Sequence, residues 1–327
     1  MPDLRSLVER EGPFLTALVP ARSDVAGAAD RFETHIDNAL RGAPDDWADH
    51  VAQIRTEMAQ LQHDRGAAVI AIRPRGGPTF YEFIDDPVRR PALAVGPVPR
   101  LAPLLEARQR IVPHVVVETD LAGADLVAFD GGSMIASEQV DGDTEHIHRG
   151  HPGGWSQRRF QQRAENTWED NATDVADATT RLVDQVGARL VLVAGPTRAQ
   201  SMVATLLEDR LRIPVQRLHA GDVDGIAAEV VRYVADIVAT DTTEMLRTLD
   251  EQIERRATTV DEVEAALEAG RVETLLVHDD SSAAPSTDDP ADVVDCCIAD
   301  ALLTDADIRV VPDVAVLDHG VAALLRW

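Results

Sequence analysis

The chain has 327 residues and a formal net charge of −26, with 57 Asp and Glu against 31 basic residues, all of which are arginine. This acidity excludes nonspecific nucleic-acid binding over the whole surface, because phosphates would be repelled, but it permits binding through one basic element. No apolar run approaches the ~20 residues of a membrane span, and the amino terminus lacks an apolar signal segment, which predicts a cytoplasmic protein without membrane contact. Hydrophobic residues make up 45% of the sequence and aromatic residues 4%, so we expect cores of Ala, Val, Leu and Ile.

The first segment, residues 1–110, is predicted to be an α/β domain. Its apolar periodicity indicates a strand at 13–20, helices at 25–40 and 46–64, and two strands at 67–72 and 79–84. The Gly/Pro turn between the last two strands is typical of a hairpin. A proline-rich run, residues 87–103, ends the segment.

The second segment, residues 111–240, combines a strand meander with alternating helices and strands. The predicted order is strands at 114–120, 124–132 and 133–140, a long helix from about 158 to 186, a strand at 189–195, a helix at 198–210, a strand at 214–218 and a helix at 223–238. This order is the one expected of an RNase-H-like layered fold, although periodicity alone does not distinguish it from other α/β folds.

The third segment, residues 241–327, is predicted to be a compact α-β-α domain that follows a helical connector at 242–257. Thr259 is the expected N-cap of its first helix and Gly270 the glycine that ends it. A strand, a polar loop at 281–290, a helix over VVDCCIADALL, and strands over IRVVP and VAVLD follow, and GVAALLRW closes the chain. The overall prediction is a three-domain α/β protein.

One stretch differs in charge from the rest of the chain. Residues 146–163, which we call the cationic segment, contain four arginines, three histidines and no carboxylate. Pro152-Gly153-Gly154 within it predicts a turn or loop tip, and Trp155 follows at that tip.

The arginines of the cationic segment favour an anionic partner. Arg158, Arg159 and Arg163 lie in the first two turns of the predicted helix, where a cation opposes the helix dipole. A phosphate bound there would gain free backbone N–H groups and the guanidinium groups together, and an exposed aromatic beside flexible glycines suits RNA stacking. The alternative is that these arginines pair with carboxylates of the same helix, such as Glu165, Glu169 and Asp170.

Other titratable residues predict no metal site. His146, His148 and His151 match no standard zinc spacing, and the adjacent Cys296 and Cys297 fit neither a disulfide framework nor a zinc motif. A set of aspartates at strand ends, Asp120, Asp125 and Asp130, could form a nuclease carboxylate cluster, but turn capping is the favoured role. No cofactor is predicted.

The sequence His151-Pro-Gly-Gly-Trp-Ser-Gln-Arg-Arg-Phe160 resembles a known motif. It is similar to the Gly-Gly-Gln loop and the following Ser-x-x-Arg-Phe helix start of the archaeo-eukaryotic class-1 peptide release factor and Pelota superfamily, in its bacterial branch. Residues 263–277, 299–303 and 318–326 look like the carboxy-terminal domain of that family, which implies an L7Ae-like fold there. The resemblance covers residues 110–327.

In that family the loop enters the ribosomal peptidyl transferase centre, and its glutamine helps water attack the peptidyl-tRNA ester. Here Gly153 and Gly154 match the glycines, but Trp155 occupies the position of the glutamine. An indole offers one N–H donor and no acceptor, so it cannot position water as an amide does. Gln157, two residues later, is the candidate catalytic residue only if the protein is hydrolytic.

The resemblance therefore implies a non-hydrolytic factor that binds the ribosomal A site near the peptidyl transferase centre, in translational stress or hibernation. The implied partners are rRNA and the tRNA acceptor end, with delivery by a translation GTPase left open. The predicted RNA-binding residues are Arg149, His151, Gly153, Gly154, Trp155, Ser156, Gln157, Arg158, Arg159 and Arg163. The alternatives are a peptidyl-tRNA hydrolase or release factor and, from a different class, a metal-dependent nuclease.

Overall fold

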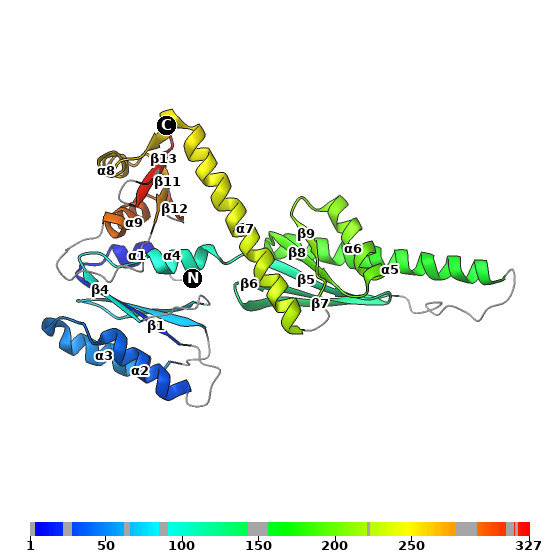
Figure 1. Cartoon of the computed structure of the whole chain (residues 1–327), viewed down its shortest axis with the longest axis horizontal. Helices are drawn as coiled ribbons and strands as arrows, with labels where there is room; N and C mark the ends of the chain where they lie inside the picture. Colours follow the sequence, from blue (N-terminus) through cyan, green and yellow to red (C-terminus); the bar gives the residue numbers. More distant parts are fainter. Residues whose placement is uncertain are drawn as a thin grey trace. The chain divides into compact units, whose positions relative to one another are not determined.

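The computed structural model is a mixed α/β protein that divides into two compact units (Figure 1). It describes residues 4–21, 28–61, 66–84, 91–142, 156–220, 223–278, 293–311, 317 and 320–327. Unit 1 contains residues 1–109 and 242–327, and unit 2 contains residues 110–241. No helix among the described residues has the length and apolar content that crossing a bilayer requires.

The amino-terminal part of unit 1 is a four-stranded antiparallel sheet in the order β3-β2-β1-β4. Its elements are α1 (Leu4–Val8), β1 (Phe14–Pro20), α2 (Ala28–Leu40), the 3₁₀ turn η1 (Asp45–Trp47), α3 (Ala48–Met58), β2 (Ala68–Pro74), β3 (Phe80–Ile84), β4 (Ala92–Gly96) and α4 (Ala102–Gln109). Helices α2 and α3 cover one face, where Phe32, Ile36 and Ile54 pack against β1 and β2. Strand β2 is buried along its whole length because both faces of the sheet are covered.

The predicted strands of this part are confirmed and both predicted helices are present, although α3 ends at Met58 and not at 64; the description of residues 87–103 as a proline-rich end is incomplete. Strand β4 lies within that run and pairs with β1 in antiparallel register. Proline masks such a strand in sequence because it removes donors, yet an edge position tolerates prolines that flank it. Figure 1 shows β4 at the edge of the sheet.

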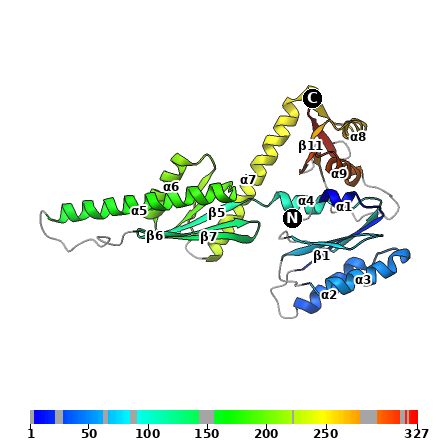
Figure 2. The same ribbon diagram turned by 180° about the vertical axis from the view of Figure 1, so that it is seen from behind.

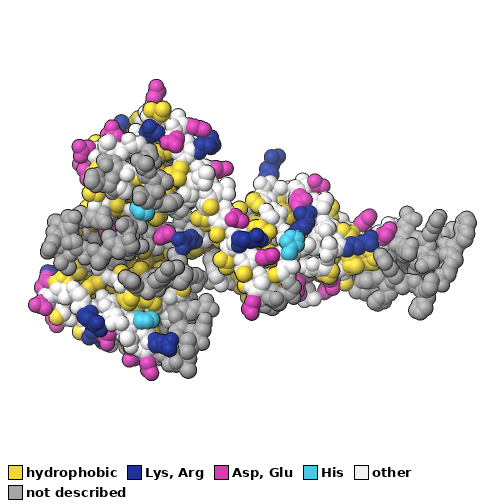
Figure 3. Space-filling view, viewed as in Figure 1, with side chains coloured by type: hydrophobic (Ala, Val, Ile, Leu, Met, Phe, Trp, Pro, Cys, Tyr) yellow, Lys and Arg dark blue, Asp and Glu magenta, His cyan; other side chains and the backbone are white. Residues whose placement is uncertain are grey.

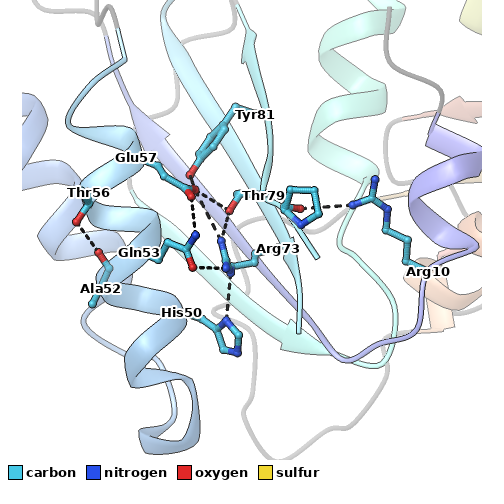
Figure 4. Close-up of polar contacts among 10 residues, drawn as sticks. Arg10, His50, Ala52, Gln53, Thr56, Glu57, Arg73, Thr79 and Tyr81 are labelled. Carbon is cyan, nitrogen blue, oxygen red and sulfur yellow. Dashed lines mark hydrogen bonds and ion pairs between the residues drawn. The ribbon is translucent and has the colours of Figure 1, made fainter. Parts of the chain in front are cut away.

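A polar network joins α3 to strands β2 and β3 (Figure 4). Arg73, with 6% of its surface exposed, donates from Nε to His50 Nδ1 (3.1 Å), from one terminal nitrogen to Thr79 Oγ1 (2.7 Å) and from the other to Gln53 Oε1. The Glu57 carboxylate accepts from Thr79 (2.9 Å), from Tyr81 Oη (2.7 Å) and from Gln53 (2.9 Å). The network therefore satisfies a buried guanidinium and holds α3 against the β2–β3 hairpin.

The same contacts shift two pKa values. Burial alone would raise the pKa of Glu57, but hydrogen bonds from Tyr81, Thr79 and Gln53, together with the Arg73 charge, outweigh it and lower that pKa below its ordinary value. Burial and the hydrogen bond to Glu57 raise the pKa of Tyr81 well above its usual range. Glu57 is thus ionised and Tyr81 is a neutral donor at neutral pH.

The carboxy-terminal part of unit 1 has a four-stranded sheet in the order β10-β13-β11-β12. Its elements are the 3₁₀ turn η2 (Ile253–Arg255), β10 (Arg256–Ala257), α8 (Val260–Glu268), β11 (Val272–Val277), α9 (Val293–Leu303), β12 (Asp307–Val310) and β13 (Val321–Leu325). Thr259 caps α8 in a capping box with Glu262, and Gly270 follows the helix with φ 63°, as predicted. The strand predicted over VAVLD lies largely outside the described residues.

The two parts of unit 1 share one apolar core. Leu4, Leu7 and Leu104 of the amino-terminal part belong to the same buried cluster as Ile298 and Val310 of the carboxy-terminal part. The Gln109 side chain pairs with the main chain of Val310, accepting from its N–H and donating to its C=O at 2.9 Å each. The division into three domains stays a prediction, and the shared core means that the segments flanking unit 2 pack as one body.

Unit 2 is a five-stranded sheet in the order β7-β6-β5-β8-β9, with helices on both faces (Figure 1). Its elements are β5 (His114–Thr119), β6 (Gly123–Asp130), β7 (Ser133–Asp141), α5 (Ser156–Val186), β8 (Leu190–Ala194), α6 (Thr197–Arg210), β9 (Val215–Arg217) and the part of α7 (Val223–Glu251) that ends at Asp241. Strands β5, β6 and β7 form an antiparallel meander, and β8 and β9 add in parallel. Helices α5 and α6 cover one face and α7 packs on the other.

This arrangement confirms the predicted meander followed by alternating elements, whereas the RNase-H-like and L7Ae-like assignments stay predictions. One helix prediction is wrong. Residues 223–238 and 242–257 were expected to be separate helices, but α7 is continuous from Val223 to Glu251. The stretch between them, residues 239–241, contains neither Gly nor Pro, so nothing in the backbone interrupts the helix.

We predict that Arg73→Met destabilises unit 1 by about 1–3 kcal/mol, because the acceptors around the buried guanidinium lose their donors. Urea unfolding followed by circular dichroism measures the change. Arg55→Met is the matched control, since Arg55 forms an ion pair with Asp37 at 2.8 Å between side chains that are both more than half exposed. Its loss should cost no more than ~1 kcal/mol, and equal losses for the two variants would contradict the assigned role of Arg73.

A second prediction concerns pH. Because the pKa of Glu57 is lowered in the folded state, its contribution to stability is present above the unfolded value of about 4.5 and is lost as pH falls through the lowered folded value. The melting temperature of the wild type should therefore drop more steeply between pH 5 and 3 (roughly the range around that value) than that of Glu57→Gln. Parallel curves for the two proteins would show that Glu57 does not contribute.

Candidate functional site: the projecting end of unit 2

In the sequence, the cationic segment begins after β7 and ends within the first turns of α5. Its residues 146–155, and with them Arg149, His151, Gly153, Gly154 and Trp155, lie outside the described residues. Residues 156–163 form the first turns of α5, which begins at Ser156, two residues before the predicted start at about 158. Gln157, Arg158, Arg159 and Arg163 are therefore placed on the helix by their backbone alone.

Helix α5 is much longer than the sheet that it covers. It has 31 residues, a length of about 46 Å at 1.5 Å per residue. Its second half packs against the sheet through small and branched side chains, among them Ala172, Val175, Ala176 and Leu182. Both views of the fold show its first turns extending past the ends of the strands (Figures 1 and 2). The predicted RNA-binding arginines on the helix therefore lie on a projecting arm.

A junction of three elements marks the place where the arm leaves the sheet. In the turn between β5 and β6, Asp120 Oδ1 accepts from the backbone N–H groups of Ala122 (2.6 Å) and Gly123 (2.9 Å). The turn's own carbonyls point outward: Ala122 O accepts from Gly142 N (2.6 Å), and Leu121 O accepts from Asn171 Nδ2 of α5 (2.9 Å). The end of β7 and the middle of α5 are thus tied to the same turn.

Next to this junction, α5 and α6 are joined by an aromatic and ionic contact. The Arg198 guanidinium lies over the Trp168 ring, 4.4 Å from its centroid, and pairs with Glu165 at 3.4 Å. The Trp168 indole nitrogen is buried and has no hydrogen-bond partner among the described residues. In the alternative interpretation, Glu165 was expected to pair with arginines of its own helix. Its described partner, Arg198, is on α6.

The three aspartates considered for a nuclease do not form a cluster. Asp120 caps its own turn, as the favoured interpretation predicted. Asp125 lies opposite Glu118 in the β5–β6 register, and Asp130 lies at the other end of β6, opposite Ser133. In the part of the chain that the structure describes, no group of three or more His, Cys, Asp or Glu could hold a metal ion.

A cavity of about 340 Å³ opens beside the junction. Its polar lining includes Glu118, Asp120, Asp125, Gln139 and Asp141. Carboxylates in such numbers repel phosphate. An RNA-directed contact is therefore not expected inside this cavity.

Five of the arginines described in unit 2 form ion pairs with carboxylates. The pairs are Arg181 with Glu138, Arg189 with Asp241, Arg198 with Glu165, Arg210 with Asp177 and Arg217 with Glu208, at 2.5–3.4 Å. On the face drawn in Figure 3, arginine side chains are interspersed with Asp and Glu and form no continuous basic patch among the described atoms.

Sequence reasoning did not single out Asn171, Gly142 or Arg198, because their roles depend on contacts between elements. An asparagine on the helical face that also carries Trp168 and Val175 was the available signal.

Comparison with known proteins finds a family match over this unit. Residues 113–255 match the family described as bacterial archaeo-eukaryotic release factor family 2. Two curated sequences of Mycobacterium tuberculosis, the uncharacterized proteins Rv2629 (strain H37Rv) and MT2704 (strain CDC 1551), are 28% identical over 226 residues. The alignment covers 67% of this chain and 59% of the relative, so the chain spans less than two thirds of the relative's length.

Solved structures of translation factors are also similar at low identity. They include archaeal Pelota from a structure of ribosome-bound Pelota and ABCE1 (15% identical, covering 99% of this chain and 92% of that chain, TM-score 0.44). Dom34 of S. cerevisiae, a termination-like factor that interacts with Hbs1, is 10% identical over 67% of this chain and 65% of that chain, with TM-score 0.41. The archaeal termination factor aRF1 is 16% identical over 99% of this chain and 96% of that chain, with TM-score 0.26.

The family match includes the whole of α5 and the cationic segment with its Gly-Gly and Arg-Phe motif. Over residues 113–255, somewhat less than half of its length, the chain is thus similar to the bacterial archaeo-eukaryotic release factors.

Proposed function

We propose that the protein is a ribosome-associated translation factor that binds near the A site and peptidyl transferase centre through the cationic segment at the end of α5. The observation that carries the proposal is the family match over residues 113–255, which contain that segment. In the finer proposal the factor contacts rRNA and the tRNA acceptor end without hydrolysing peptidyl-tRNA, and acts in translational stress or hibernation. Delivery by a translation GTPase is an extension of the same proposal.

The distribution of charge supports the choice of contact surface. The described arginines Arg181, Arg189, Arg198, Arg210 and Arg217 are paired with carboxylates, which removes much of their attraction for phosphate. The cationic segment has four arginines and no carboxylate in its sequence. In a chain of charge −26, RNA approaches most favourably where this local excess of positive charge lies.

The residue after the two glycines supports a role without hydrolysis. Trp155 stands where the resemblance expects glutamine, and its indole can donate one hydrogen bond but cannot accept one. Attack on an ester by water requires an acceptor that orients the water as well as a donor. Stacking on a base is the contact that an indole makes well.

We expect the double variant Arg158→Glu/Arg159→Glu to lose co-sedimentation with 70S ribosomes at moderate salt, because two guanidinium groups that attract phosphate become two carboxylates that repel it. The variant Arg181→Glu/Arg217→Glu is the matched control, since it makes the same change in charge within unit 2 at arginines that are already paired. The control should still co-sediment. Unchanged binding of the first variant would remove the cationic segment from the proposal.

A release assay separates the two functional classes. Ribosomes carrying labelled peptidyl-tRNA should release no peptide above background at saturating wild-type protein, because Trp155 cannot replace glutamine. Release that disappears in Gln157→Ala would instead establish the hydrolase alternative and make Gln157 its catalytic residue.

A further inference from the structure

The junction between β7, the β5–β6 turn and α5 lies at the root of the projecting arm. Asn171 is the sixteenth residue of the helix, so Ser156 lies about 22 Å along the axis from it at 1.5 Å per residue. A small tilt of α5 at Asn171 therefore becomes a displacement of several ångströms at the first turn. The direction of the helix at this point decides where its arginines are presented.

Asn171 is built into the junction rather than exposed on the helix. Only 3% of its surface is exposed, and its Nδ2 donates to Leu121 O at 2.9 Å. The accepting turn is itself fixed, because Asp120 Oδ1 accepts from two of its N–H groups and Thr119 Oγ1 donates to Gly123 O at 3.0 Å. The Asn171 amide thus links α5 to the β5–β6 turn, and the hydrogen bonds within that turn restrict its movement.

Gly142 completes the junction from the side of β7. Its N–H donates to Ala122 O at 2.6 Å. A Cβ at this position would overlap the Asn171 side chain and would also lie 2.6 Å from Ala122 O. Close approach, and not a left-handed backbone, is what requires glycine here. The residue that follows β7 and the middle of α5 are thereby held against each other.

We propose that Asn171 and Gly142 are positioning residues that aim the arm: they fix the direction of α5 and so present the arginines of its first turns to the ribosome. The consequence for ribosome binding rests on the proposed function, whereas the geometry of the junction does not. Only molecules in which α5 has this direction can then bind the ribosome. The apparent affinity for ribosomes therefore falls in proportion to the fraction of such molecules.

The geometry is tested by a distance measurement in the free, full-length protein. Spin labels are attached to cysteines introduced at Ser137 of β7 and Gln162 of α5, in a chain carrying Cys296→Ser and Cys297→Ala, and pulsed electron resonance gives the distance distribution. The distribution should be narrow with Asn171 and Gly142 intact. It should broaden in Asn171→Asp, which keeps the size but loses the donor, and independently in Gly142→Ala.

Val175→Ala is the matched control because Val175 is buried one turn further along the same face of α5, with 1% of its surface exposed, outside the junction. It should lower the melting temperature without broadening the distribution, which separates aiming from general stability. An unchanged distribution in both Asn171→Asp and Gly142→Ala, with circular dichroism showing folded protein, overturns the inference. Equal broadening in Val175→Ala overturns it too.

Ribosome co-sedimentation supplies the functional readout. Loss of about one buried hydrogen bond, of the order of 1 kcal/mol, lowers the ratio of correctly aimed to misdirected molecules roughly fivefold, and the binding of Asn171→Asp is weakened by at most that factor. Equal binding of wild type and Asn171→Asp overturns the aiming role. A wild-type chain that fails to bind ribosomes overturns the proposed function alone, and the distance distribution still decides whether the junction aims the arm.

Discussion

Packing of the second half of α5 on the β5–β6 sheet is the interaction on which the functional end of the protein depends. Ala172, Val175 and Ala176 let the helix axis approach the strands closely, and Leu182 fills the space nearer the helix end. Full burial of a Val or Leu side chain contributes about 1.5–3 kcal/mol. Because this apolar face anchors only part of the helix, the remaining turns can project without contributing to the core.

Electrostatics complement this mechanical arrangement. A chain with excess carboxylate repels nucleic acid, and pairing of arginines such as Arg210 and Arg217 with carboxylates keeps the described body of unit 2 from presenting a basic surface. The cavity lined by Glu118, Asp125 and Asp141 acts in the same direction. In the proposed function, a cationic segment at the amino-terminal end of α5 concentrates attraction for phosphate at one place, which would favour a specific docking geometry over general adhesion to RNA.

Unit 1 shows a different use of burial. The segments on either side of unit 2 contribute Leu4, Leu104 and Ile298 to one core. The Gln109 side chain forms two hydrogen bonds with the main-chain N–H and C=O of Val310. Separating them would expose apolar surface from both sheets, so we expect residues 1–109 and 242–327 to be stable only together. The buried Arg73 network adds specificity within this unit, because a guanidinium with several fixed acceptors tolerates few alternative packings.

The sequence by itself determined the local elements and the chemistry of the candidate site. Apolar periodicity predicts β1, the β5–β7 meander and α5, and the capping residues Thr259 and Gly270 mark the ends of α8, because these signals depend on residues close in the chain. The cationic segment and its likeness to the release factor motif are also visible in sequence. Strand β4 was missed because flanking prolines mask an edge strand, and α7 was divided although residues 239–241 contain no Gly or Pro that would end a helix.

Only the tertiary structure decided which residues meet. The pairing of Asn171 with Leu121, the contact of Gly142 with Asn171, and the shared core of unit 1 join positions about 30 to 300 residues apart in the chain. No periodicity or spacing reports such contacts, because they depend on the relative placement of elements after folding. The charge and the motif of the cationic segment are therefore properties of the sequence, whereas the direction of α5, which carries part of that segment, is set by packing.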